Sequence, residues 1–347
     1  MQKNNFDFLR FIFAFGVILA HIYELTINSE VFPAAKHIDS FIAVSGFFII
    51  SGFLITNSYS RCQNLKDYLV KRARRILPAY IFVIVICSIV LSLASTFSFG
   101  HYFSSNSLYQ YVGANLLFLN FLHPCLPGVF DHNFMCAVDG SLWTLKVEVS
   151  FYLILPIIFY LIMRTGKKAP ALFILYVLSL TYNFCLYKYF QVHQNPSLYF
   201  TLSHQLPSLM PYFIAGMAVF FYFDSMLKYK TLLFLIALPV YLGEYYWGFE
   251  ILRPLALTII IFYVAYSFSF LNNFAKYGDF SYGIYIFHFP VIQLFIACGL
   301  YQKYPSWISV TLTLLISLIL GVLSWNFIEK KFLTKARVSH YPKSVIG

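Results

Sequence analysis

Long apolar stretches that recur from one end of the chain to the other constrain its fold more than any other feature. Each is close to the roughly 20 residues that an α-helix needs to cross the hydrocarbon core of a bilayer. The runs are continuous, whereas the strands of a membrane barrel alternate apolar and polar residues. We therefore predict an all-α, polytopic membrane protein with about ten transmembrane helices. The predicted spans are residues 6–26, 40–58, 76–97, 147–164, 170–188, 208–223, 231–246, 251–271, 281–301 and 307–328.

The composition and the placement of charge agree with that prediction. Of the 347 residues, 60% are hydrophobic and only 11% are charged, and the mean hydropathy of +0.73 is far above that of soluble proteins. The formal net charge of +11 could indicate a nucleic-acid partner, but the basic residues lie mostly in short loops between the spans, so we expect none. With the N-terminus in the cytoplasm, most Lys and Arg residues fall on the inner side. The positive-inside rule then predicts an even number of spans and two cytoplasmic termini.

The first predicted span carries two ionisable side chains on one face. Arg10 and His21 are eleven residues apart, which leaves them roughly 20° out of alignment and about 16 Å apart along the helix. A charge at membrane depth costs roughly 2.5–3.5 kcal/mol on insertion scales, so the presence of two ionisable residues on one face of a span calls for a functional explanation. Singly, Arg10 could be an anchor that snorkels to the interface and His21 a packing histidine. Together they predict a functional site, with Glu24 either orienting the imidazole or lying at the interface.

A basic cluster, Lys71, Arg72, Arg74 and Arg75, precedes the third predicted span. One interpretation is a positive-inside anchor, which needs no ligand. The other is an anion-binding site, because guanidinium groups bind phosphate bidentately and keep their charge. A nucleotide-phosphate ligand such as coenzyme A would suit this inner rim, and Arg10, near the same leaflet, would add to it.

Two later segments place polar side chains in apolar helices. Glu148 enters the fourth span, where a carboxylate is costly unless it is paired. Lys146 is too close in sequence to face it on a helix, so we expect a partner from another span. Trp143 is either an interfacial belt aromatic or part of a site. His288 lies deep in the ninth span, where a packing histidine and a functional one are equal alternatives.

Six cysteines are present, and two of them, Cys125 and Cys136, fall in a long outer loop at about 98–146. An oxidising compartment would permit a disulfide between them, and free thiols are an equal alternative. No Cys or His spacing repeats the known zinc patterns, so we expect no metal. In the second span, the pairs Ser45-Gly46 and Ser51-Gly52 are expected to allow the close approach of other helices.

These motifs resemble the integral-membrane acyltransferase family 3, which includes bacterial O-antigen, exopolysaccharide and Nod-factor acetyltransferases. Arg10 and His21 match its arginine–histidine signature in the first helix, and Arg72 and Arg75 match its Arg-x-x-Arg motif. The other matching segments are FFIISGFLI at 47–55, SLWTL at 141–145 with Glu148 and FY at 151–152, SYGIY at 281–285 with His288, and SWNFIE at 324–329. Lys331 departs from the family, whose members often have proline after the basic residue, and we expect this to affect only the helix end.

The resemblance implies transfer of an acyl group, usually acetyl, from cytoplasmic acetyl-CoA to a hydroxyl of a cell-surface or lipid-linked glycan. His21 is then the expected catalytic residue, and Glu148 acts with it, on the acceptor side or in support. The expected donor-binding residues are Arg10, Arg72 and Arg75, and the expected supporting residues are Glu24, Trp143, Tyr282 and His288. Residues 1–347 are expected to form a single membrane acyltransferase domain of the bacterial inner membrane, without the periplasmic esterase-like domain that some members append.

Alternatives to this function remain open from the sequence. A transporter or flippase would also place Arg, His and Glu inside a membrane, on a substrate or proton pathway. The chain shows no convincing internal repeat of the kind found in inverted-repeat transporters. The acyl group could be succinyl, and the acceptor could be O-antigen, capsule, exopolysaccharide, peptidoglycan or a secondary metabolite. A non-catalytic scaffold is disfavoured because it leaves the aligned charges of the first helix unexplained.

Overall fold

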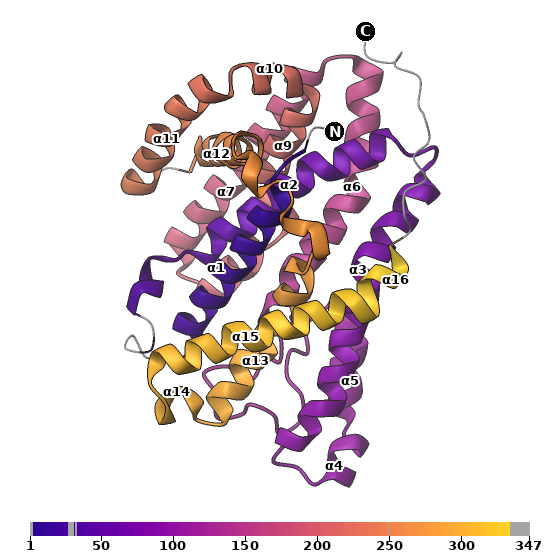
Figure 1. Cartoon of the computed structure of the whole chain (residues 1–347), viewed down its shortest axis with the longest axis vertical. Coiled ribbons are helices and arrows are strands. Elements are labelled where there is room, and N and C mark those ends of the chain that lie inside the picture. Colours follow the sequence, from indigo (N-terminus) through magenta and orange to yellow (C-terminus); the bar gives the residue numbers. More distant parts are fainter. Residues whose placement is uncertain (1–2, 27–30, 32, 249, 334–347) are drawn as a thin grey trace.

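The computed structural model describes residues 3–26, 31, 33–248 and 250–333, and this part of the chain is almost entirely helical (Figure 1). Within it the only β-type pairing is one isolated bridge between Cys125 and Ala137. The helices are α1 (Phe6–Thr26), α2 (Ser40–Ser60), α3 (Leu65–Val90), α4 (Phe99–Ser104), α5 (Asn106–Leu116), α6 (Trp143–Thr165), α7 (Lys168–His193), α8 (Pro196–Ser203), α9 (Leu206–Phe221), α10 (Phe223–Lys228), α11 (Lys230–Trp247), α12 (Arg253–Ser267), α13 (Ser281–Ala297), α14 (Leu300–Lys303), α15 (Ser306–Ser324) and α16 (Lys330–Phe332), with short 3₁₀ segments between some of them and a π-helix at Trp325–Glu329.

Each of the ten predicted spans falls on a helix, but fewer of these helices are long enough to cross a membrane unaided. Among the described residues, six are long and apolar enough, or seven if the bent pair that begins with α12 is one span. Two of the others, α9 and α13, have only 16 and 17 residues. The all-helical membrane class is therefore confirmed, and the number ten stays a prediction.

The third span differs from its prediction at its start. The basic cluster was expected in a loop that ends at residue 75, yet α3 already begins at Leu65. The side chain of Asn64 accepts a hydrogen bond from the backbone N–H of Asp67 at 2.8 Å, which caps the helix ahead of the basic residues. Lys71, Arg72 and Arg75 consequently project from a rigid helix and not from a loop.

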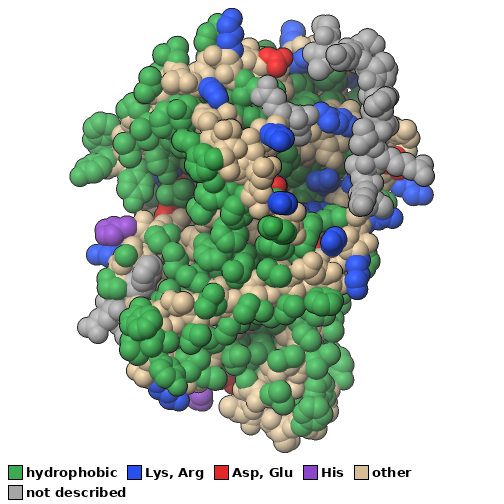
Figure 2. All heavy atoms as spheres, in the orientation of Figure 1, with side chains coloured by type: hydrophobic (Ala, Val, Ile, Leu, Met, Phe, Trp, Pro, Cys, Tyr) green, Lys and Arg blue, Asp and Glu red, His purple; other side chains and the backbone are tan. Residues whose placement is uncertain are grey.

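The outward faces of the helices are apolar, as contact with lipid requires. On α6, Leu153, Ile157 and Leu161 recur at intervals of four residues and are 60, 60 and 52% exposed, while Leu155 and Ile158 on the opposite face are buried. Figure 2 shows hydrophobic side chains over much of one face of the molecule, with most of the visible Lys and Arg in its upper part. Soluble monomers rarely expose apolar surface on this scale.

Glycines set the closest helix contacts, and these position the site. A Cβ on Gly52 of α2 would strike the backbone of Phe213, and a Cβ on Gly216 of α9 would strike that of Ile49. Hence α2 and α9 touch through their backbones, which confirms the close approach predicted at Gly52. Next to them, α1 packs between α2 and α13.

The segment between α5 and α6 is held in place covalently and by hydrogen bonds. Cys125 and Cys136 form a disulfide in the structure. Gln293 of α13 donates hydrogen bonds from Nε2 to the carbonyl oxygens of Met135 and Ala137, both at 2.7 Å. This segment is thereby tied to the same helix that carries His288.

Removal of the disulfide should destabilise the protein. Replacing Cys125 and Cys136 together by serine is expected to lower stability by about 2–4 kcal/mol, because the unfolded chain gains the freedom that the crosslink removes. The measurement is thermal unfolding in detergent, with Cys185→Ser, an exposed free cysteine of α7, as the matched control. An unchanged unfolding midpoint, or both thiols found free in non-reduced peptides by mass spectrometry, would contradict it.

Candidate active site

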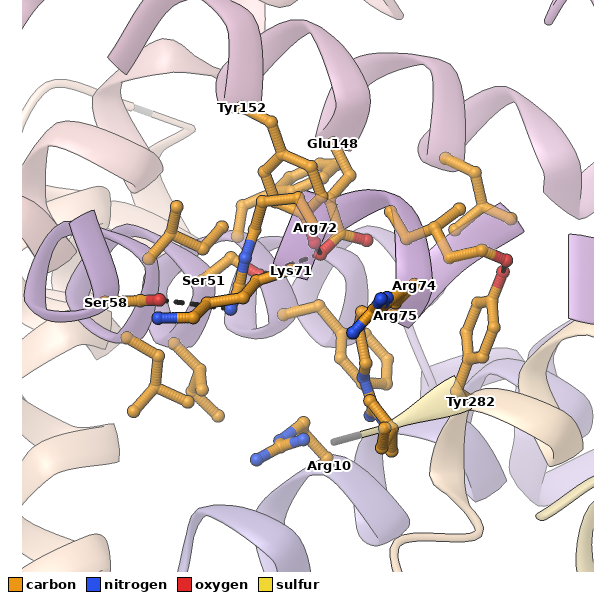
Figure 3. Close-up of a pocket in the computed structure, with 18 of the residues that line it drawn as sticks. Arg10, Ser51, Ser58, Lys71, Arg72, Arg74, Arg75, Glu148, Tyr152 and Tyr282 are labelled. Carbon is orange, nitrogen blue, oxygen red and sulfur yellow. Dashed lines mark hydrogen bonds between the residues drawn. The ribbon is translucent and has the colours of Figure 1, made fainter. Parts of the chain in front are cut away.

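A cavity of about 1170 Å³ lies between α1, α2, α3, α6 and α13 (Figure 3). Basic side chains line it where α2 ends and α3 begins, among them Arg61, Lys71 and Arg72. At its other end it is lined by Phe47, Thr144 and Tyr285. Five of the residues predicted from the sequence line this one cavity: Arg10, Arg72, Arg75, Glu148 and Tyr282. The other four do not: His21, Glu24, Trp143 and His288.

Arg10 and Arg75 share one carboxylate, that of Asp279. Arg10 Nη1 lies 2.5 Å and Arg75 Nη2 2.6 Å from the same oxygen, Oδ2, although the residues come from α1, α3 and the segment before α13. Burial opposes ionisation of Asp279, but the two guanidinium groups outweigh it and hold the pKa of this carboxyl well below its usual range. Ser281 donates a further hydrogen bond to Oδ1 at 2.5 Å. Asp279 therefore fixes both arginines at the cavity wall.

A second carboxylate approaches Arg75 from the end of the chain. The π-helix at Trp325–Glu329 follows α15 and buries Glu329, whose Oε2 lies 3.8 Å from Arg75 Nη1. Ser324 donates a hydrogen bond to Oε1 of the same carboxylate at 2.8 Å. Single turns of π-helix occur frequently at functional sites, because the extra residue changes where a side chain points. Here the change of direction brings a carboxylate towards the arginine cluster.

Arg72 is paired differently from the other two arginines. Its Nη2 donates to the hydroxyl of Ser58 at 3.1 Å, and its guanidinium carbon lies 5.7 Å from the centre of the Tyr152 ring. Among the described residues it makes no ion pair with a carboxylate. Arg72 thus offers an uncompensated positive charge to an anion in the cavity, whereas Arg10 and Arg75 are already neutralised in part by Asp279.

Glu148 of α6 lines the same cavity and is hydrogen-bonded on one oxygen. Tyr152, one turn further along α6, donates to Oε1 at 2.6 Å, and Ser51 of α2 donates to the same atom at 3.3 Å. The partner expected from another span is therefore Ser51, and it is neutral. Lys146 points elsewhere, with its ammonium 4.8 Å from the centre of the Phe121 ring. Glu148 lies with the arginines and not beside His21.

His21 meets His288 outside the cavity. His21 Nδ1 and His288 Nε2 are 2.8 Å apart, and the rings are nearly parallel with centres 5.1 Å apart. Glu24 approaches His21 on the other nitrogen, with 3.8 Å between Nε2 and Oε2. The ring of Tyr285 lines the cavity and lies 5.7 Å from the His288 ring, centre to centre. Tyr285 therefore connects the cavity to the histidine pair.

The two remaining predicted residues have packing partners. Tyr282 donates a hydrogen bond to the carbonyl oxygen of Ile76 at 2.9 Å, and its ring centre lies 5.8 Å from the guanidinium carbon of Arg75. Trp143 packs edge-on against His204, with ring centres 4.3 Å apart. Tyr282 thus supports Arg75 in the cavity wall, while Trp143 lies away from it.

Asp279 and Glu329 were not among the residues predicted from the sequence. Asp279 lies two residues before the matching segment SYGIY at 281–285, and Glu329 is the last residue of SWNFIE at 324–329. The available signal was a carboxylate at the edge of an apolar run, since it needs a cation partner at membrane depth. Within the described residues, no three His, Cys, Asp or Glu side chains are grouped so that they could hold a metal ion.

Comparison with known proteins identifies the family. The profile of the acyltransferase family 3, described as "Acyltransferase domain", matches residues 3–326. The chain belongs to this family. It is 30% identical to the O-acetyl transferase of Shigella phage Sf6, over 97% of this chain and 98% of that protein. No solved structure matches the chain.

Two further relatives share somewhat less sequence identity with the chain. The chain is 27% identical to nodulation protein 10 of Rhizobium leguminosarum bv. viciae, over 95% of this chain and 93% of that protein. It is 24% identical to a putative O-acetyltransferase of Staphylococcus aureus (strain COL), over 94% of this chain and 56% of that protein. The predicted family and enzyme class are therefore confirmed: this is a multi-pass membrane protein and an acyltransferase.

Proposed function

We propose that this enzyme transfers an acyl group, acetyl in the first instance, from cytoplasmic acetyl-CoA to a hydroxyl of a cell-surface or lipid-linked glycan. The observation that carries the proposal is the basic cavity, because Arg10, Arg72 and Arg75 from two different helices converge on one space that Glu148 also lines. Guanidinium groups suit the phosphates of coenzyme A. The relatives named as O-acetyltransferases support a hydroxyl as the acceptor.

The proposed topology places the donor and acceptor on opposite sides of the bacterial inner membrane. It has ten spans, both termini in the cytoplasm and one acyltransferase domain over residues 1–347. The arginine end of the cavity then faces the cytoplasm, where coenzyme A is found, and His21 lies about 16 Å further along α1. An extended pantetheine arm can bridge that distance.

In the proposed reaction, the donor phosphates rest on Arg72, with Arg10 and Arg75 completing the positive wall. The thioester passes Phe47 and Tyr285, which line the far end of the cavity, and reaches His21. His21 removes the proton of the acceptor hydroxyl, whose oxygen attacks the acyl carbon as the thiolate of coenzyme A leaves. Glu148, hydrogen-bonded to Tyr152 and Ser51, orients the donor in the cavity.

A reconstituted assay tests the function directly. Purified protein in liposomes is supplied with labelled acetyl-CoA on the side of the arginine cluster and with glycan from the parent strain on the other. We expect release of the coenzyme A thiol together with labelled glycan, and none of either from liposomes without protein. Movement of glycan or acyl compound without thioester consumption would replace the proposal with transport.

Mass spectrometry of surface glycans identifies the acceptor and the acyl group. A deletion strain is compared with its parent, and the mass of the group that disappears distinguishes acetyl from succinyl. Glycans that are identical in the two strains would contradict a glycan acceptor.

A further inference from the structure

The ring of His288 has two hydrogen-bond partners of different kinds. The side chain is fully buried in α13. Its Nδ1 lies 2.6 Å from the carbonyl oxygen of Tyr285, and its Nε2 lies 2.8 Å from Nδ1 of His21. A carbonyl oxygen can only accept a hydrogen bond, so Nδ1 of His288 carries a proton.

The second nitrogen of His288 must then be an acceptor. The contacts of His288 within the described residues are aromatic rings, the backbone of Tyr285 and Ile284, and His21, and none is a carboxylate. A buried charge without such a partner is costly, so the ring is neutral and its Nε2 bears a lone pair. His21 therefore donates to it from Nδ1.

We propose that His288 is a positioning residue that holds His21 in the tautomer protonated on Nδ1, so that Nε2 of His21 is the basic atom of the site. This inference rests on the proposed function for its catalytic consequence, but the tautomer follows from the hydrogen bonds and the burial of His288. Nε2 of His21 faces Glu24 at 3.8 Å, which is beyond hydrogen-bond distance, so the carboxylate does not hold a proton on that nitrogen.

The protons balance over one turnover. The hydroxyl proton passes to Nε2 of His21 while the acceptor oxygen bonds to the acyl carbon and the carbon–sulfur bond breaks. The departing thiolate then takes the proton from Nε2, and His288 keeps its own proton throughout. While His21 is doubly protonated, its hydrogen bond to His288 becomes charge-assisted and therefore stronger.

Nitrogen-15 NMR of the histidine-labelled protein in nanodiscs tests the tautomer without any substrate. His21 is assigned by the signals that vanish in His21→Asn. We expect a protonated Nδ1 and an unprotonated Nε2 on His21 in the parent protein. The reverse tautomer in the parent would overturn the inference, whatever the protein acylates.

Two substitutions of His288 separate positioning from packing. His288→Gln keeps an oxygen acceptor at the position of Nε2, whereas His288→Leu removes it. We expect His288→Leu to lower kcat at least tenfold with the KM for acetyl-CoA unchanged, and to populate the other tautomer of His21. His288→Gln should retain the tautomer and most of the kcat.

The control is His193→Leu, which removes an exposed histidine of α7 that takes no part in the site. It should leave kcat at the parental value. Equal losses of kcat in His288→Gln and His288→Leu, with the His21 tautomer unchanged in both, would assign His288 to packing and overturn the proposal. If neither the parent protein nor any variant transfers an acyl group, but His21 has the expected tautomer by NMR, then the proposed function fails and the positioning of His21 by His288 stands.

Discussion

Replacing His21 by alanine is expected to lower acyl transfer by about 10²–10⁴-fold, the usual contribution of a general base. The imidazole is the one group of the α1 face that can take a proton from a hydroxyl near neutral pH. Because His21 does not line the cavity, affinity for coenzyme A should stay at the parental value. The measurements are kcat with labelled acetyl-CoA and the Kd for coenzyme A in detergent.

His193→Ala serves as the matched control, since it removes a histidine that is exposed on α7. Its activity should equal that of the parent. If His21→Ala acylates its glycan at the parental rate, His21 is not the base, and the mechanism above loses its central step. If His21→Ala loses coenzyme A binding in step with activity, His21 belongs to the donor site instead.

The arginine substitutions should divide into two classes. Arg72→Ala is expected to weaken coenzyme A binding about tenfold or more and to leave stability near that of the parent, because within the described part of the chain Arg72 pairs with Ser58 and the face of Tyr152 and with no carboxylate. Arg75→Ala should also weaken binding. In addition, it leaves Asp279 and Glu329 short of a cation, which should destabilise the protein by about 2 kcal/mol.

Isothermal titration with coenzyme A and thermal unfolding in detergent separate the two effects. Arg164→Ala, an exposed arginine at the end of α6 that does not line the cavity, is the matched control and should change neither quantity. Unchanged affinity in the Arg72→Ala/Arg75→Ala double variant would contradict a donor site in this cavity. If the double variant loses no more affinity for coenzyme A than Arg164→Ala does, the basic cluster is only a membrane anchor.

Local periodicity explains why α1 could be predicted well. The alignment of Arg10 and His21 depends only on the helical repeat, and the helix runs unbroken from Phe6 to Thr26. The bilayer requires helices, so the long apolar runs predict them without knowledge of packing. The same reasoning misjudged the start of α3, because a polar first turn carries no hydrophobic signal. Hydrophobicity alone also does not determine the number of spans, because helices such as α9 are too short to cross a bilayer unaided.

The partners of the ionisable groups depend on contacts between distant segments. Arg10 and Asp279 are separated by 269 positions in the chain, and Arg75 and Asp279 by 204. The sequence predicted Arg10, Arg72 and Arg75 as one donor site, but Asp279 pairs with Arg10 and Arg75, and of these three only Arg72 has no ion pair among the described residues. Likewise Glu148 was expected near the catalytic residue, and the packing of α6 against α2 places it among the arginines.

The sequence by itself determined that this protein is a helical membrane acyltransferase and that Arg10 and His21 lie on one face of its first helix. Both follow from hydrophobicity and helical repeat, which act over neighbouring residues, and from motifs that can be recognised in order along the chain. Only the tertiary structure decided which charges are compensated and that His21 meets His288 from 267 positions away. Those outcomes depend on how helices cross, and crossing is decided by contacts, such as that of Gly52 with α9, that no local pattern specifies.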